Sequence, residues 1–254
     1  MEREYLLYAH RGSNKRLPEN TLEAFRQGLQ EGANALEMDV MLTSDDVVVV
    51  FHDVTGSRMA NKPFRIRDIP WSEIRNWDLG LQYRGDPVAR HFLDHQFRVP
   101  KFEEILEAFP NTYLNIDIKL SNLRLVSIVI ELIRKYQAMS RVRLTSFNWQ
   151  VHQMLHSLRY EGPVGLSQLE VAMVFFLPED LLKNQRLANR AIQIPTQYGP
   201  LRLDKREFIE KCHKLGMRVD YWVINDFATA RDLVSRGADG IMSDTPAAIV
   251  GAGG

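Results

Sequence analysis

The chain has 254 residues, of which 45% are hydrophobic and 25% charged, so it can bury a sizeable core and is not intrinsically disordered. Its 32 basic and 32 acidic residues give a formal net charge of +0, which argues against a strong overall field for nucleic acid or anionic membranes. No apolar run approaches the roughly 20 residues that span a bilayer. We therefore expect a cytoplasmic protein with no stable membrane insertion and no nucleic-acid partner.

Short apolar runs alternate with segments of helical period along the whole chain. The first run, Leu6 to Ala9, precedes a helix that the pattern predicts over Thr21 to Gln30, with Asn20 as its N-cap. The next two runs, Ala35 to Leu42 and Val47 to Phe51, are separated by only a few polar residues, too few for a parallel crossover. They are predicted to form an antiparallel hairpin.

Eight of these runs are separated by enough chain to be parallel strands joined through helices. Eight such strands over about 250 residues are typical of a (β/α)₈ TIM barrel, whereas an open doubly wound sheet is the alternative. The sequence thus predicts a single domain over residues 1–254. The predicted parallel strands are Leu6 to Ala9, Ala35 to Leu42, Tyr113 to Ile118, Val142 to Ser146, Val164 to Leu166, Ala191 to Ile194, Arg218 to Val223 and Gly240 to Met242.

One stretch, Val54 to Val99, lacks this alternation and is interrupted by several prolines and glycines. It contains one short amphipathic piece, Trp71 to Trp77. A long irregular insertion in a compact domain is usually a lid or a binding element. Because it directly follows His52 and Asp53, we expect it to cover a site at those residues.

Polar residues gather where the predicted strands end, which is where barrels of this class carry their reactive groups. His10 and Arg11 follow the first strand, and the second strand carries Glu37 and Asp39. His52 ends the return strand of the hairpin. A further pair, Asp117 and Lys119, lies at the end of the strand after the insertion.

The hairpin predicts how two of these groups meet. If Asp45 and Asp46 form a two-residue turn, the ladder places Asp39 opposite His52. Side chains alternate between the two faces of a strand, so Glu37 and Asp39 project to the same face. Packed carboxylates repel one another unless a cation or a base lies among them.

With Asp117 from the neighbouring strand, three carboxylates converge at one end of the barrel. Oxygen ligands of this kind suit a hard divalent cation, Mg²⁺ or Ca²⁺. The alternative is a salt-bridge network with Arg11 and Lys119. These two cations also suit a phosphoryl group, and His10 and His52 suit general acid–base catalysis near neutral pH, so cleavage of a phosphodiester is the predicted chemistry.

The same residues resemble a known family, the glycerophosphodiester phosphodiesterases, through ordered motifs that cover nearly the whole chain. The motifs are His10-Arg11-Gly12, Pro18-Glu19-Asn20-Thr21, Leu36-Glu37-Met38-Asp39-Val40, Phe51-His52-Asp53, Val99-Pro100-Lys101-Phe102-Glu103-Glu104, Asp117-Ile118-Lys119, Ser146-Phe147, Trp222-Val223-Ile224-Asn225 and Asp239-Gly240-Ile241-Met242-Ser243-Asp244-Thr245-Pro246.

The resemblance implies a distorted (β/α)₈ barrel with a small insertion after the second histidine, at about residues 54–99. It also implies metal-dependent hydrolysis of small glycerophosphodiesters to an alcohol and sn-glycerol 3-phosphate. The roles that it implies are His10 and His52 as the acid–base pair, Glu37, Asp39 and Asp117 as ligands of Mg²⁺ or Ca²⁺, and Arg11 and Lys119 as phosphate contacts. The chain departs from the family at Asp117, where glutamate is usual.

Several alternatives stay open. Trp222 could contact the substrate or fill the top of the barrel. The pairs His91/His95 and His152/His156 have the spacing of two ligands on one helix face but lack the glutamate of a metalloprotease motif, so surface positions are the favoured interpretation. The buried-looking Cys212 is the only cysteine and is predicted to be inert. Phospholipase D-like hydrolysis of lysophospholipids and a non-catalytic phosphate-ester-binding barrel are the alternative functions.

Overall fold

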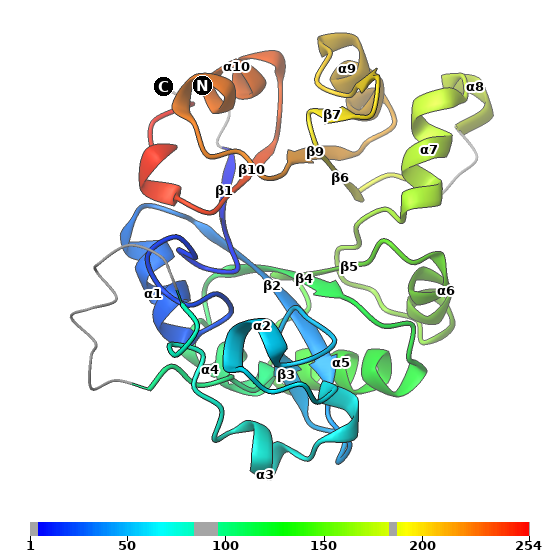
Figure 1. Ribbon diagram of the computed structural model, residues 1–254. Helices are drawn as coiled ribbons and strands as arrows, with labels where there is room; N and C mark the ends of the chain where they lie inside the picture. The colour runs from blue at the N-terminus through cyan, green and yellow to red at the C-terminus, as the bar shows by residue number, and fades with distance from the viewer. Residues whose placement is uncertain (1–4, 84–95, 183–186, 254) are drawn as a thin grey trace.

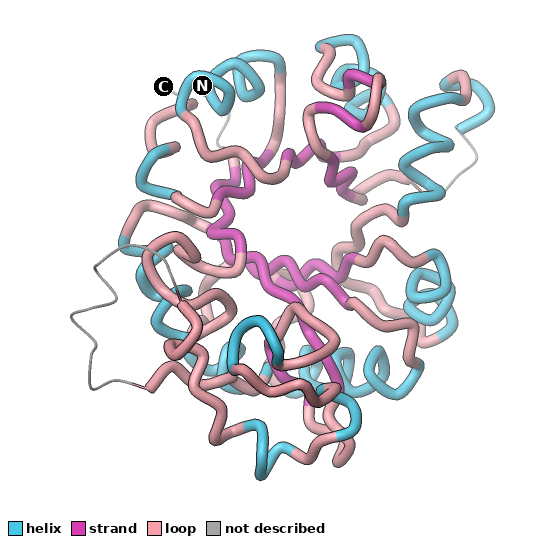
Figure 2. The backbone as a smooth tube through the Cα atoms, viewed as in Figure 1, coloured by secondary structure: helices cyan, strands magenta, loops and turns pink. Residues whose placement is uncertain are grey.

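A computed structural model of the chain describes residues 5–83, 96–182 and 187–253. Its strands form a ring surrounded by helices (Figures 1 and 2). The main sheet has the order β5-β4-β2-β1-β10-β9-β6, and all neighbours in that order are parallel. The strands are β1 Leu6–His10, β2 Ala35–Leu42, β3 Val48–Val50, β4 Tyr113–Ile118, β5 Val142–Thr145, β6 Ala191–Ile194, β7 Gln197–Tyr198, β8 Leu201–Arg202, β9 Arg218–Tyr221 and β10 Gly240–Ser243.

The predicted fold class is confirmed, with one difference at the closure of the ring. Val164 and Gly165, predicted as part of a full strand, form only isolated bridges, from Val164 to Leu144 on β5 and from Gly165 to Ala191 on β6. A β-carbon at position 165 would lie 2.4 Å from the hydroxyl oxygen of Thr145, so only glycine fits this close approach. We call this pair of bridges the seam.

The longer helices lie outside the ring and bury apolar residues against it. In α5, five buried residues recur at helical spacing, and the side chain of Asn122 caps its first turn by accepting a hydrogen bond from the amide of Leu125 at 3.1 Å. The helices are α1 Leu22–Gln30, α2 Ser57–Ala60, α3 Trp71–Ile74, α4 Phe102–Ala108, α5 Leu123–Lys135, α6 Trp149–Ser157, α7 Gln168–Phe176, α8 Glu179–Leu182, α9 Arg206–Lys214 and α10 Phe227–Arg236, with 3₁₀ turns η1 Ile66–Asp68 and η3 Pro246–Ala248.

No helix within the three described ranges is both long and apolar enough to cross a membrane. The main core lies between the ring and the helices, where it joins apolar side chains of the strands and of the covering helices. A second, separate core lies under the insertion. It packs buried side chains of the insertion, among them Met59, Ile66 and Trp77, against the hairpin residues Met41, Val49 and Phe51. The insertion is therefore an anchored layer on the face of the hairpin that carries Met41, which is also the face of β2 that carries Glu37 and Asp39.

The hairpin forms as predicted, but its predicted register is wrong by one residue. Val40 pairs with Val50 and Leu42 with Val48, so Asp39 lies opposite Phe51 and accepts a backbone hydrogen bond from it. The cause is the turn: Thr43 and Val47 close a three-residue loop in which Asp46 has φ +62°, instead of a two-residue turn. β3 ends at Val50, so strand alternation no longer sets the direction of the His52 side chain. His52 therefore lines the cavity in spite of the shifted register.

The start of α1 also differs from the prediction. Thr21, and not Asn20, is the N-cap, since its hydroxyl accepts the amide of Ala24 at 3.2 Å. Asn20 adopts φ +59° and donates its side-chain amide to Asp39 at 3.0 Å. The residue predicted to start a helix therefore holds a site carboxylate.

Candidate active site

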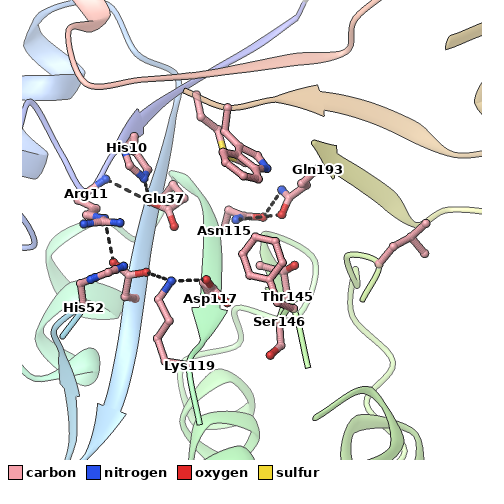
Figure 3. Close-up of a pocket in the computed structure, with 15 residues that line it drawn as sticks. His10, Arg11, Glu37, His52, Asn115, Asp117, Lys119, Thr145, Ser146 and Gln193 are labelled. Carbon is pink, nitrogen blue, oxygen red and sulfur yellow. Dashed lines mark hydrogen bonds and ion pairs between the residues drawn. The ribbon is translucent and has the colours of Figure 1, made fainter. Parts of the chain in front are cut away.

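All eight residues predicted for the site line one cavity of about 200 Å³, which opens at the carboxyl ends of the barrel strands (Figure 3). The structure thus brings the predicted site residues together without exception, although their roles stay predictions. The eight are His10, Arg11, Glu37, Asp39, His52, Asp117, Lys119 and Trp222. The other lining residues are Asn115, Thr145, Ser146, Phe147, Leu166, Gln193 and Met242.

Strand register sets the layering of the site. Neighbouring residues of a parallel ladder point to the same face of the sheet. His10 pairs with Glu37, and Glu37 pairs with Asn115, which gives one layer. Asp39 pairs with Asp117, and Asp117 with Thr145, which gives the next layer. The two carboxylates of β2, two residues apart, therefore serve different layers of one cavity.

His10 is held between two carboxylates. Its Nδ1 donates to Asp244 at 2.7 Å, and its Nε2 lies 3.8 Å from Glu37. Burial alone would lower the pKa of His10, but Glu37 and the hydrogen bond to Asp244 raise it above its ordinary value. The charged imidazolium is thus favoured, and Nδ1 is occupied, so Nε2 is the nitrogen left to exchange a proton in the cavity.

Asp244 is itself held by two neutral amides and one exposed ammonium. The side-chain amides of Asn14 and Asn225 donate to it at 2.6 and 3.2 Å, and the ammonium of Lys15 lies 3.6 Å away. Burial would raise the pKa of Asp244, but the hydrogen bonds from His10 and Asn14 lower it well below its usual range. It therefore stays ionised and orients His10.

His52 carries the same kind of partner. Its Nδ1 donates to Asp53 at 2.6 Å, and its side chain is more exposed than that of His10, 31% against 17%. Burial would raise the pKa of Asp53, but hydrogen bonds from Arg58 and His52 lower it. Each predicted catalytic histidine therefore has one ring nitrogen fixed by an aspartate, and the sequence prediction assigned a role to neither aspartate.

The ammonium of Lys119 lies between the two carboxylates of the second layer. It is 2.9 Å from Asp39 and 2.6 Å from Asp117 (Figure 3). Burial would lower the pKa of Lys119, but these two acids raise it. Asp39 also has Arg11 Nε at 3.2 Å. The salt-bridge network weighed as an alternative to a metal is thus present in the structure.

The charge at these acids is only partly balanced. The pKa of Glu37 is raised to about 7 by burial and by the neighbouring Asp39, and burial also raises the pKa of Asp117. In contrast, Lys119 and Arg11 overcome the effect of burial on Asp39 and lower its pKa. The charges of the buried Glu37 and Asp117 are thus not fully balanced by the neighbouring cations.

The geometry fits a divalent cation in part. Oxygens of Asp39 and Asp117 converge on one point, where the Lys119 ammonium stands in for a cation. Glu37 instead faces His10 and accepts the amide of Arg11 at 3.2 Å. Accordingly, no set of three His, Cys, Asp or Glu side chains within the described ranges is arranged as ready metal ligands. The all-oxygen donor chemistry and the unbalanced charge suit a hard cation.

Arg11 is positioned by an unusual backbone. It adopts φ +57°, and Gly12 follows with φ +85°. A β-carbon on Gly12 would lie 2.5 Å from the backbone of Ala24 in α1, so glycine is required for this turn. The Arg11 guanidinium then reaches Glu19 at 3.1 Å, which explains why His10, Arg11 and Gly12 form one motif.

The remaining wall of the cavity carries no charged side chain. Trp222 and Phe147 stand edge to face, with ring centroids 5.9 Å apart at 89°, and Phe147 is 56% exposed. Across the cavity floor, Gln193 donates to Asn115 at 2.8 Å. Trp222 thus lines the cavity and does not merely fill the barrel. The sequence prediction missed Phe147, although it lies in the Ser-Phe motif.

Other candidates fall outside this cavity. His91 and His95 lie outside the described residues. His156 is exposed, as predicted, but His152 is buried, because its ring bonds the carbonyl of Ser146 at 2.8 Å. The surface interpretation of His152 was therefore wrong. Cys212 is buried, and burial raises the pKa of its thiol to about 12, as expected of an inert thiol.

Comparison with known proteins identifies the family. The model of the glycerophosphoryl diester phosphodiesterase family matches residues 10–248. The chain belongs to this family. The resemblance and the enzyme class predicted from the sequence are thereby confirmed.

Individual relatives of the phosphodiesterase family cover the chain almost from end to end. A glycerophosphodiester phosphodiesterase of Caldanaerobacter subterraneus subsp. tengcongensis is 28% identical over 96% of this chain and 96% of its own. A human lysophospholipase D is 26% identical over 94% of this chain and 82% of its own. A crystal structure of glycerophosphodiester phosphodiesterase from Agrobacterium tumefaciens superposes with a TM-score of 0.79 at 25% identity, covering 97% of this chain and 99% of the other.

Proposed function

We propose that the chain hydrolyses small glycerophosphodiesters to an alcohol and sn-glycerol 3-phosphate by general acid–base catalysis. The observation that carries this proposal is the pair of aspartate-held histidines, His10 and His52, on the wall of one cavity that also holds Arg11 and Lys119. Membership of the family and the relative from Caldanaerobacter support the substrate class.

The two histidines divide the proton transfers. His10, between Glu37 and Asp244, has a raised pKa, which favours its protonated form, so His10 takes the role of acid and donates a proton to the leaving alkoxide. The negative charge of Asp53 beside His52 is balanced by Arg58, so His52 takes the role of base and removes the proton of the attacking oxygen. One acid and one base complete the displacement at phosphorus.

Arg11 and Lys119 would contact the phosphodiester. Each now neutralises Asp39, at 3.2 and 2.9 Å, and each lines the cavity. An anionic substrate oxygen can therefore take up part of their hydrogen-bonding capacity when it enters. Cations placed before the reaction stabilise the charge that develops on the phosphoryl oxygens.

Glu37, Asp39 and Asp117 would hold a divalent cation, Mg²⁺ or Ca²⁺. When bound, such an ion supplies positive charge to the phosphoryl oxygens and to a reacting oxygen. The chain's own contribution is the placement of oxygen donors in two adjacent layers of the cavity. With Asp117 one methylene shorter than the usual glutamate, the site would be wider at this ligand.

Removal of metal tests the assignment of a divalent cation directly. Glycerophosphocholine is incubated with the protein after exhaustive chelation and after addition of Mg²⁺ or Ca²⁺, and released sn-glycerol 3-phosphate is measured. We expect chelation to abolish turnover and either ion to restore it. Full turnover after chelation would contradict the metal assignment but leave the acid–base roles standing.

Lysophospholipase D-like activity is a second candidate, favoured by the exposed Phe147 beside Trp222, an apolar wall that an acyl-bearing substrate could use. A lysophospholipase D is also among the relatives. Turnover of glycerophosphocholine and lysophosphatidylcholine is compared at equal concentration. We expect the first to be preferred; turnover of the second alone would reverse the order of the two candidates.

A further inference from the structure

Arg58 belongs to the insertion and lies outside the residues that line the cavity. We propose that Arg58 is a positioning residue that fixes two site groups at once, His52 through Asp53 and Arg11 through Glu19. This proposal rests on the roles proposed above for His52 and Arg11. We refer to Arg58, Asp53 and Glu19 together as the clasp.

The guanidinium of Arg58 makes four hydrogen bonds to two carboxylates, and its Nη1 also donates to Met59 Sδ at 3.2 Å. Its Nε and Nη2 donate to Asp53 at 2.7 and 3.0 Å. Its Nη1 and Nη2 donate to Glu19 at 2.9 and 2.6 Å. Two bidentate contacts of this kind fix the planes of both carboxylates, which an ammonium group could not do.

Each carboxylate passes this orientation to one site residue. The same Oδ1 of Asp53 that accepts from Arg58 accepts from His52 Nδ1 at 2.6 Å. The same Oε1 of Glu19 that accepts from Arg58 accepts from Arg11 Nη1 at 3.1 Å. One cation thus joins a general base and a phosphate contact that come from different loops.

The clasp is anchored on the insertion. Arg58 lies in α2, and the two residues that follow it, Met59 and Ala60, are buried in the second core. Asp53 and Glu19 are only 24% and 15% exposed, whereas Arg58 is 48% exposed. Without Arg58, two largely shielded carboxylates would lose the cation that they share, with only Arg11 left beside Glu19, and would separate, carrying His52 and Arg11 with them.

The first test replaces Arg58 with methionine, which keeps most of the apolar stem of the side chain and removes its donors. We expect kcat/KM to fall roughly 10- to 100-fold, the cost of losing outer partners and of a misplacement of about 1 Å. Both kcat and KM should change, because one arm ends on His52 and the other on Arg11. The matched control is Arg67→Met in the same insertion, where an exposed ion pair with Asp68 is lost and kinetics should stay normal.

The two arms can then be separated. Asp53→Asn should lower mainly kcat, since it acts through His52, and Glu19→Gln should raise mainly KM, since it acts through Arg11. In the double variant of Asp53→Asn and Glu19→Gln, Arg58→Met should cause little further loss, because both of its partners are neutral. A full additional loss in that background would overturn the clasp.

Chemical rescue separates positioning from support of the fold. Because Arg58 is half-exposed, added guanidinium should restore part of the activity of Arg58→Ala, and the same concentration of sodium chloride should not. If Arg58→Ala fails to fold, Arg58→Lys replaces it in this test. The kcat/KM of Arg58→Lys should lie between those of the unsubstituted protein and of Arg58→Met, and its KM should rise as in Arg58→Met. A folded variant with normal kinetics, or a loss that guanidinium does not reduce, would overturn the proposal.

Two further variants keep this result distinct from the proposed function. His52→Ala and Arg11→Met should each impair turnover whether or not the clasp exists. Normal turnover in those variants would reject the roles of His52 and Arg11. Impaired turnover in them together with normal turnover in Arg58→Met would reject the clasp alone.

Discussion

The two histidines of the cavity have the same local geometry and different surroundings. In each, Nδ1 donates to an aspartate, at 2.7 Å for His10 and 2.6 Å for His52. The aspartate of His10 is held by two neutral amides, and Glu37 adds a second negative charge nearby. The aspartate of His52 is paired with a guanidinium. The cation beside Asp244 is the exposed ammonium of Lys15 at 3.6 Å, whereas Asp53 forms a close ion pair with Arg58 at 2.7 Å.

This difference is the basis on which we propose His10 as the acid and His52 as the base. A histidine between two carboxylates favours its charged form, as the raised pKa of His10 shows. An aspartate paired with arginine orients its histidine with less electrostatic effect. The distinction depends on groups outside the cavity wall, Asn14 and Asn225 on one side and Arg58 on the other.

The largest expected effect is the loss of either ring. We expect His10→Ala and His52→Ala each to reduce kcat roughly 100-fold or more while folding is retained. Steady-state kinetics on glycerophosphocholine measure the loss, and circular dichroism checks the fold. Near-normal turnover in either variant would show that its acid–base role is wrong.

Removal of charge from each dyad should give a smaller effect. Asp244→Asn and Asp53→Asn are each expected to lower kcat roughly 10- to 100-fold, the usual cost of losing an outer partner. A substrate with a more acidic leaving alcohol needs less protonation, so it should reduce the defect of Asp244→Asn only. An equal reduction in both variants would remove the assigned difference between the two histidines.

Glu37 lies beside His10 and so offers a pH test of that side. Its folded pKa of about 7 exceeds its ordinary value of 4.5. Between these values the folded chain keeps a proton that the unfolded chain has lost, so stability falls as pH rises through this window. Metal-free protein should lose up to about 3 kcal/mol across it. Urea unfolding measures the slope, which Glu37→Gln should abolish; an unchanged slope would contradict the raised pKa.

The smallest effect is expected at the uncharged wall. Phe147→Ala removes one ring of an edge-to-face pair, worth about 0.5–1.5 kcal/mol, so KM should rise about 2- to 10-fold with kcat nearly unchanged. Initial-rate kinetics on glycerophosphocholine test this. A fall in kcat as large as that of the histidine variants would mean that the aromatic pair orders the reacting groups.

Much of the site could be predicted from the sequence because its groups follow strand ends. His10, Glu37, Asp39 and Asp117 are register neighbours on β1, β2 and β4, and parallel strands carry such residues to one end of the barrel. The local sequence pattern is sufficient to predict a contact when the pairing of neighbouring strands brings the two residues together.

The groups that hold the site could not be predicted in this way. Asp244 meets His10 across 234 residues, and Arg58 meets Glu19 across 39. No periodicity links such positions. The hairpin register failed because Asp46 accepts a positive φ and lengthens the loop by one residue. Asn20 was wrongly predicted as the N-cap of α1, because the helix begins one residue later, at Thr21. The side-chain amide of Asn20 is then free of the helix and bonds the carboxylate of Asp39.

The seam at Val164 and Gly165 lies away from the strands that carry most of the charged groups of the cavity. In the strand order, β1, β2 and β4, which carry most of the charged groups of the cavity, lie inside the sheet, whereas β5 and β6 are its two ends. The seam joins those ends next to the uncharged lining residues Thr145, Leu166 and Gln193. Changes of length or shape at the seam can therefore alter which alcohol the cavity admits while leaving the phosphodiester machinery intact. The seam is therefore the part of the barrel where such changes disturb the charged groups least.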